Sequence, residues 1–109
     1  MFIVYKVMVN YKNAKIYRIV DRVTGNCYIG STCAEYLSSR LIEHKSRYKQ
    51  FISGVNPRYI TSFEIIKNAN YYIELLENVN CKNKNQLTKR EIYWTSQFDC
   101  VNKRAGGIC

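Results

Sequence analysis

The chain has 109 residues, of which 47% are hydrophobic and 23% are charged, a globular composition that argues against disorder and predicts one domain with one compact core. No apolar run approaches the about 20 residues of a membrane-spanning helix. Seventeen Lys and Arg against eight Asp and Glu give a net charge of +9, which favours a polyanionic partner such as nucleic acid or an acidic membrane surface, although A/T-rich coding also produces such a composition.

The first third of the chain predicts a β-hairpin. Residues 1–13 begin with a loosely alternating run of β-branched and aromatic types, so we expect an extra strand or an ordered arm there. Residues 15–20 and 27–31 have strand-like composition, and the Thr-Gly-Asn sequence at 24–26 is typical of a tight turn. The two strands should therefore pair.

A long helix is expected directly after the hairpin. Thr32 and Glu35 fit a capping box, in which each side chain bonds a backbone amide at the start of a helix. The helix should end near Ser53, because Gly54 suits a left-handed terminator and Pro57 prevents continuation. The inward stripe of this helix is predicted to be Leu37, Leu41, Tyr48 and Ile52.

A short helical turn and a third strand are expected next. Thr61 or Ser62 can cap a turn that ends at Ile66. Residues 71–76 are dense in strand formers and predict the third strand.

The last element predicted is a second main helix over residues 86–98, with Asn85 as its cap. Residues 99–109 are expected to be irregular. Together the elements predict an α+β fold in which helices flank a small three-stranded antiparallel sheet. The inward stripe of the second helix is predicted to be Leu87, Trp94 and Phe98.

Three ionisable side chains lie where helical periodicity favours apolar ones. Glu91 falls on the inward stripe of its helix, where a carboxylate is seldom buried unless it is paired or binds a metal. Arg40 and His44 are four residues apart on one helix face; Arg suits phosphate, and His moves protons near neutral pH. Taken singly, Glu91 is equally a rim carboxylate or a salt-bridge partner, and structural roles are favoured for Arg40, as a snorkelling side chain, and for His44, as a core residue. Together the three favour a site.

Two tyrosines in the hairpin also have either a packing role or a role in a site. Tyr17 and Tyr28 are opposite or diagonal neighbours if the strands pair, so both hydroxyls project from one face of the sheet. In a Tyr-rich chain, packing is the commoner reason for such a pair. Gly30 allows close backbone approach, which would open space beside Tyr28 for a bulky ligand.

The order of a hairpin, an Arg-x-x-x-His helix and a later Glu helix resembles the GIY-YIG nuclease family. This family includes intron homing endonucleases, the N-terminal nuclease of bacterial excision repair, some restriction enzymes and small stand-alone members carried by large DNA viruses. The resemblance spans residues 15 to about 103 and implies that residues 14–109 form a GIY-YIG nuclease fold. Lys15-Ile16-Tyr17 stands at the first triplet, with Lys15 in place of glycine, and Tyr28-Ile29-Gly30 matches the second. The other matching positions are Arg40, His44, Glu91 and Asn102.

The resemblance implies a metal-dependent DNA endonuclease that hydrolyses phosphodiester bonds. The cofactor would be Mg²⁺, with Mn²⁺ able to substitute, and Glu91 would be its protein ligand. Tyr17 would be the general base or the group that positions water, with Tyr28 as its partner. Arg40 would hold the scissile phosphate, and His44 would orient the tyrosines or help to move a proton. Because an unperturbed phenol has a pKa of about 10, a base role requires that this pKa be lowered.

DNA would be the partner, and no membrane contact is expected. Asn102 either bonds backbone and fixes the tail or contacts phosphate, and the structural role is favoured. Two alternatives remain: a non-catalytic nucleic-acid-binding module on the same scaffold, and a basic domain for protein contacts. The expected DNA-binding residues are Lys15, Gly30, Lys45, Arg47, Lys49 and Asn102.

The remaining expectations concern location and assembly. The five cysteines include no C-x-x-C pair, which argues against a zinc knuckle and favours reduced thiols inside a cell. The start of the chain contains Lys6 and does not resemble a signal peptide, so we expect a protein of the host cytoplasm or nucleus that is not secreted. Without an appended recognition domain, it should act as a monomer or weak dimer, or with an accessory recognition subunit.

Overall fold

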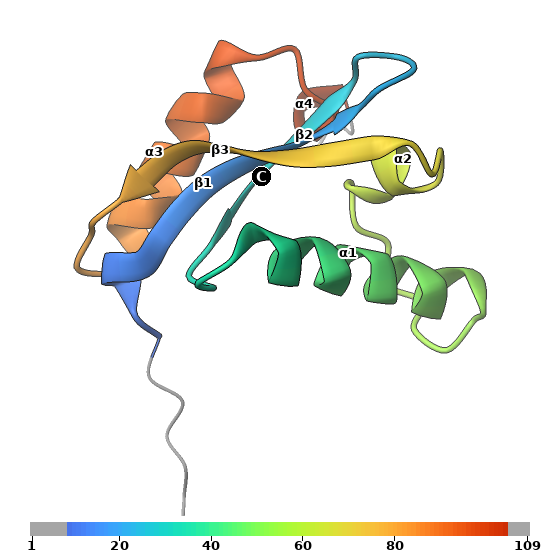
Figure 1. Cartoon of the computed structure of the whole chain (residues 1–109), viewed down its shortest axis with the longest axis horizontal. Helices are drawn as coiled ribbons and strands as arrows, with labels where there is room; N and C mark the ends of the chain where they lie inside the picture. Colours follow the sequence, from blue (N-terminus) through green and yellow to red (C-terminus); the bar gives the residue numbers. More distant parts are fainter. Residues whose placement is uncertain (1–8, 105–109) are drawn as a thin grey trace, which may run out of the picture.

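Three strands form one antiparallel sheet in the order β2-β1-β3, which the computed structural model describes together with its helices over residues 9–104 (Figure 1). The prediction of an α+β fold with a three-stranded antiparallel sheet is therefore confirmed. The predicted strand or arm over residues 1–13 lies mostly outside the described residues, and its described end forms a short 3-10 turn. In chain order the elements are η1 (Tyr11–Asn13), β1 (Ala14–Asp21), β2 (Cys27–Thr32), α1 (Leu37–Ile52), α2 (Phe63–Ile66), β3 (Tyr71–Val79), α3 (Lys84–Gln97) and α4 (Val101–Arg104).

The β1–β2 hairpin forms as predicted. Gly25 has a φ of +77°, which a residue without a Cβ adopts readily. The buried Asp21 carboxylate accepts hydrogen bonds from the backbone N–H groups of Val23 and Thr24, at 2.8 and 3.3 Å. These contacts fix the start of the turn at Asp21, and the turn sets the register of the two strands.

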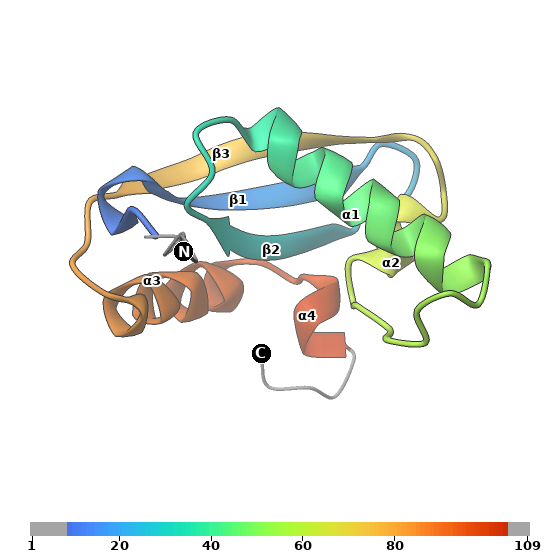
Figure 2. The ribbon, with the colours of Figure 1, turned by 90° about the horizontal axis from the view of Figure 1, so that it is seen from below.

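The sheet divides the core into two clusters, so the expectation of one compact core is wrong. Side chains alternate across a strand, and both faces of β1 are buried. Ile16 and Val20 pack towards α3, whereas Tyr17 and Ile19 pack towards α1 and α2. Figure 2 shows α1 and α3 on opposite sides of the sheet.

The first helix begins later than predicted. Thr32 belongs to β2, and its hydroxyl accepts from the N–H of Ala34 at 3.1 Å, so it caps no helix. The residue that precedes α1 is Tyr36, which makes no side-chain capping bond. At the other end Gly54 has the expected left-handed φ of +79°, but Ile52 is 62% exposed, so its assignment to the inward stripe is wrong.

The elements after α1 differ from prediction mainly in their boundaries. The helical turn α2 follows Ser62, as expected, although that side chain makes no capping bond. Strand β3 extends three residues beyond the predicted end at residue 76. Asn83, not Asn85, caps α3, because its extended backbone lets its side-chain oxygen accept from the N–H of Gln86 at 3.0 Å.

The predicted stripe of α3 is confirmed, since Leu87 is buried and Trp94 and Phe98 pack against the same cluster. The prediction that residues 99–109 are irregular is wrong for the described part, where α4 forms a helical turn. Residues 105–109 lie outside the described residues. Within residues 9–104, no helix combines the length and the apolar character that a bilayer crossing requires.

Asn102 on α4 closes the exposed edge of β2. Its side-chain oxygen accepts from the N–H of Ile29 at 2.9 Å, and its amide nitrogen donates to the carbonyl of the same residue at 2.8 Å. Ile29 and Asn102 are both buried, so these bonds satisfy two backbone groups of Ile29 that would otherwise lack partners away from water. The structural role favoured for Asn102 is confirmed.

We predict that Asn102→Ala lowers the free energy of unfolding by about 2–4 kcal/mol, because two buried backbone groups of Ile29 lose their partners. Urea denaturation measures the loss. Asn80→Ala, at an exposed asparagine, is the matched control and should change stability by less than about 0.5 kcal/mol. Equal effects of the two substitutions would show that the hydrogen bonds between Asn102 and Ile29 contribute nothing to stability.

Candidate active site

Tyr17 occupies the centre of the face that the sheet presents to α1. It lies on the central strand and is fully buried, with Gly30 as its partner on β2. A Cβ built on Gly30 would lie 2.4 Å from the Tyr17 hydroxyl oxygen. The space that Gly30 leaves is therefore filled by the Tyr17 ring, and the expectation that it opens room for a bulky ligand is wrong.

Tyr28 is the diagonal neighbour of Tyr17, because Ile19 pairs with Tyr28 while Tyr17 pairs with Gly30. Both tyrosine rings meet the same imidazole edge-on. The ring centroids of Tyr17 and Tyr28 lie 5.9 and 5.5 Å from that of His44. The two tyrosines thus share a face, as predicted, and clamp one histidine between them.

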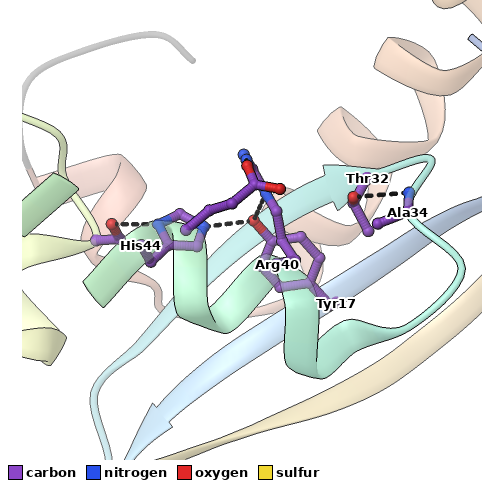
Figure 3. Close-up of polar contacts among 7 residues, drawn as sticks. Tyr17, Thr32, Ala34, Arg40 and His44 are labelled. Carbon is purple, nitrogen blue, oxygen red and sulfur yellow. Dashed lines mark hydrogen bonds and ion pairs between the residues drawn. The ribbon is translucent and has the colours of Figure 1, made fainter. Parts of the chain in front are cut away.

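A line of hydrogen bonds runs through His44 (Figure 3). Its Nε2 lies 2.7 Å from the Tyr17 hydroxyl, and its Nδ1 lies 2.8 Å from the Ser62 hydroxyl. All three side chains are buried. Ser62 does not cap α2 because its hydroxyl is directed to His44 instead.

Arg40 completes this group from the first turn of α1. Its Nε–H donates to the Tyr17 hydroxyl at 3.1 Å, and its Nη1 donates to the Glu43 carboxylate at 2.9 Å. A guanidinium has five N–H donors, so further donors are left for a ligand. The side chain is 23% exposed, which makes Arg40 the member of the group that reaches solvent.

Burial keeps both members of the Tyr17–His44 pair neutral. It raises the pKa of the Tyr17 phenol, an effect that the Arg40 charge opposes and the Glu91 charge adds to. Burial, together with the charges of Arg40 and Arg47, lowers the pKa of His44 from 6.5 to about 4. The Tyr17 oxygen accepts from Arg40, and Nε2 of His44 lies within hydrogen-bond distance of the same oxygen. In the free protein the phenol pKa therefore moves opposite to the direction that a general base needs.

Glu91 approaches from the other side of the sheet. It lies on α3, where its carboxylate receives a hydrogen bond from the side chain of Ser31 on edge strand β2. Burial raises its pKa, while the Ser31 bond and the Arg40 charge oppose the rise. Glu91 is half-buried and joins the Tyr17 group through charge, across β2.

A magnesium ion fits the chemistry of this carboxylate. Among the described residues, no three His, Cys, Asp or Glu side chains gather as a metal site. Mg²⁺ typically takes one or two carboxylates and completes its shell with water and substrate oxygens. Glu91 supplies one hard oxygen donor of this kind.

The predicted DNA-binding residues are not all gathered at this site. The Lys15 ammonium donates to the backbone carbonyls of Asn13 and Ala34, both at 2.9 Å, so it is held by the protein itself. Asn102 is buried on the edge of β2. The exposed members, all on α1, are Lys45, Arg47 and Lys49.

Two residues of the site were not predicted. Glu43 stands three residues after Arg40 on the same helix, a spacing that signals an ion pair and could have been found. Ser62 lies on a separate element, and its sequence suggested only a helix cap.

Comparisons with protein-family models, with curated proteins and with solved structures find no match for this chain. The arrangement joins a buried tyrosine, a neutral histidine and a solvent-reaching arginine, with a carboxylate across one strand. Such a group can bind an anion and relay a proton beside it.

We predict that His44 makes the stability of the protein depend on pH between 7 and 5. The unfolded chain binds the imidazole proton near pH 6.5 and the folded protein near pH 4, so stability is lost as the pH falls through this window. The loss from pH 7 to pH 5 should be about 2 kcal/mol. Urea denaturation at both pH values measures it.

The chain has a single histidine, so His44→Gln is the matched control. The stability difference between wild type and this variant should narrow by that amount as the pH falls. Glu91 has a raised pKa, which increases stability as the pH falls, but this contribution is the same in wild type and variant. The difference between the two proteins therefore reports the contribution of His44 alone. A difference that stays constant with pH would contradict the lowered pKa of His44.

Proposed function

We propose that the protein is a metal-dependent DNA endonuclease of the GIY-YIG type, which hydrolyses phosphodiester bonds. The observation that carries the proposal is the Tyr17 hydroxyl, which bonds both His44 at 2.7 Å and Arg40 at 3.1 Å. A packing tyrosine needs neither an arginine nor a histidine on its hydroxyl. A module that only binds nucleic acid has no use for a buried proton-transfer pair.

Arg40 would hold the scissile phosphate. Its bonds to Tyr17 and Glu43 fix the guanidinium, while its other N–H groups remain available. An arginine that is oriented before the substrate arrives stabilises the charge of a phosphoryl transition state without reorganisation.

The proton of the attacking water would move along Tyr17 and His44. Tyr17 takes the proton at its hydroxyl oxygen and passes its own hydrogen to Nε2 of His44. The charges of Arg40 and Arg47 help to lower the pKa of His44, and a bound phosphate would offset these charges. Substrate would therefore make the imidazole a better proton acceptor than it is in the free protein.

Ser62 and Tyr28 would position this histidine. In the tautomer that this proton path requires, the Ser62 hydroxyl accepts from Nδ1–H and Nε2 is the acceptor that faces Tyr17. The Tyr28 ring packs against the edge of the imidazole. Neither residue needs to touch the reacting atoms.

Glu91 would hold a Mg²⁺ or Mn²⁺ ion. When bound, this ion would neutralise charge on the leaving 3′ oxygen and on the phosphate. The charges of Glu91 and Arg40 act on each other, so Glu91 would hold the metal within electrostatic range of the phosphate that Arg40 binds. The net charge of +9 would supply the attraction to DNA that is independent of sequence.

We predict that the protein converts supercoiled plasmid to open-circular or linear DNA with Mg²⁺ or Mn²⁺, and that Glu91→Gln abolishes this conversion by removing the metal ligand. Agarose gel electrophoresis measures it, with a chelator as the metal control. Glu35→Gln removes an exposed carboxylate and is the matched control, which should cleave like wild type. Cleavage that persists in Glu91→Gln would indicate the wrong site, and binding without cleavage would favour the non-catalytic module.

We further predict that Tyr17→Phe lowers the single-turnover cleavage rate by about 10²–10⁴-fold and leaves DNA affinity unchanged, because the ring stays while the proton path is lost. Rapid-quench kinetics at saturating protein measures the rate, and fluorescence anisotropy measures the affinity. An unchanged rate would remove Tyr17 from the proposed chemistry.

A further inference from the structure

A second basic site lies at the far end of α1. A pocket of about 360 Å³ opens where the loop after α1 folds back against the helix. Its lining is mostly polar and carries no carboxylate: Arg47, Gln50, Asn56, Arg58 and Ile60.

The loop that carries Arg58 is held in place. The carbonyl of Gln50 accepts from the N–H groups of Val55 and Asn56, at 3.0 and 3.1 Å. The side-chain oxygen of Asn56 then accepts from the N–H of Arg58 at 3.0 Å. On the other side of Arg58, the Tyr59 ring packs 5.5 Å from the ring of Phe51. Arg58 thus extends from an anchored segment of backbone.

The two arginines of the pocket are not neutralised. Within residues 9–104, the ion pairs of the protein involve other cations, namely Arg18, Arg40, Lys67 and Arg90. Two guanidinium groups that face one polar pocket without a carboxylate form a site for an oxyanion, which their planar forks bind well.

The pocket lies on the same face of α1 as Arg40. Arg47 follows Arg40 by seven residues, so the two lie on one face of α1, about 10 Å apart along the helix axis. Both arginines also act on His44, whose pKa their charges help to lower. Arg58 lies beyond Arg47, at the end of the same helix.

We propose that Arg47 and Arg58 bind a backbone phosphate of the nucleic-acid strand whose scissile phosphate lies at Arg40. The proposal rests on the proposed function, because it identifies the strand through Arg40. A contact of this kind adds affinity and orientation but no sequence preference. It would fix the direction in which the strand crosses α1.

The test is DNA binding by the full chain, measured by fluorescence anisotropy on a labelled duplex in EDTA. Arg58→Gln and Arg47→Gln should each raise Kd roughly five- to tenfold and reduce the slope of log K against log salt by about one. Arg22→Gln is the matched control for the loss of one positive charge. Arg22 is exposed and stacks on Tyr72, which belongs to the α3 face of the sheet, so this variant should behave like wild type.

Equal shifts in all three variants would overturn the proposal, because they would report net charge alone. Binding of inorganic phosphate and of polyglutamate is measured in parallel, with wild type and with Arg58→Gln. Arg58-dependent binding of either probe, with DNA affinity independent of Arg58, would assign the pocket to a free anion or an acidic protein and overturn the proposal. Arg58-dependent DNA binding by a protein that cleaves no plasmid would support the pocket and overturn the nuclease instead.

Discussion

The hydrogen bond between the Tyr17 hydroxyl and Nε2 of His44 joins the central strand to the long helix at 2.7 Å, and the surrounding structure depends on it. A buried hydroxyl requires a partner, and a buried imidazole requires two. Gly30 makes room for the tyrosine ring on the neighbouring strand. Ser62 satisfies the second nitrogen of His44 and so ties α2 to α1. One polar contact thus positions two strands and two helices around itself.

The electrostatics of the site follow from the depth of this contact. Burial disfavours charge on Tyr17 and His44, so both side chains stay neutral, while the contacts of Arg40 with Tyr17 and Glu43 outweigh the cost of burial and raise the pKa of Arg40. A neutral Tyr17–His44 pair beside the partly exposed Arg40 cation favours the binding of an anion at this site. The cations then extend along α1 to Arg47 and Arg58, so the positive potential forms a track rather than a point.

Strand β2 is an edge strand, and two residues far along the chain, Asn102 and Glu91, interact with it. Asn102 replaces a neighbouring strand by bonding both backbone groups of Ile29. Glu91 reaches Ser31 from α3 and brings a carboxylate to within electrostatic range of Arg40 on the opposite face. The thin edge of the sheet is therefore the place where groups from both layers act together.

Much of this architecture is encoded locally. Strand composition and the Gly25 turn determine the hairpin, Gly54 determines where α1 ends, and periodicity places His44 and Leu87 inward, because each depends only on neighbouring residues. Local patterns failed where a distant partner competed for the same group: Ser62 serves His44 instead of capping α2, and Gly30 accommodates Tyr17 instead of a ligand. The division of the core by the sheet, the raised pKa of Tyr17 and the pocket between Arg47 and Arg58 likewise arose only in the folded chain. Burial and contact between segments distant in sequence decide these features, and neither is a property of any single segment.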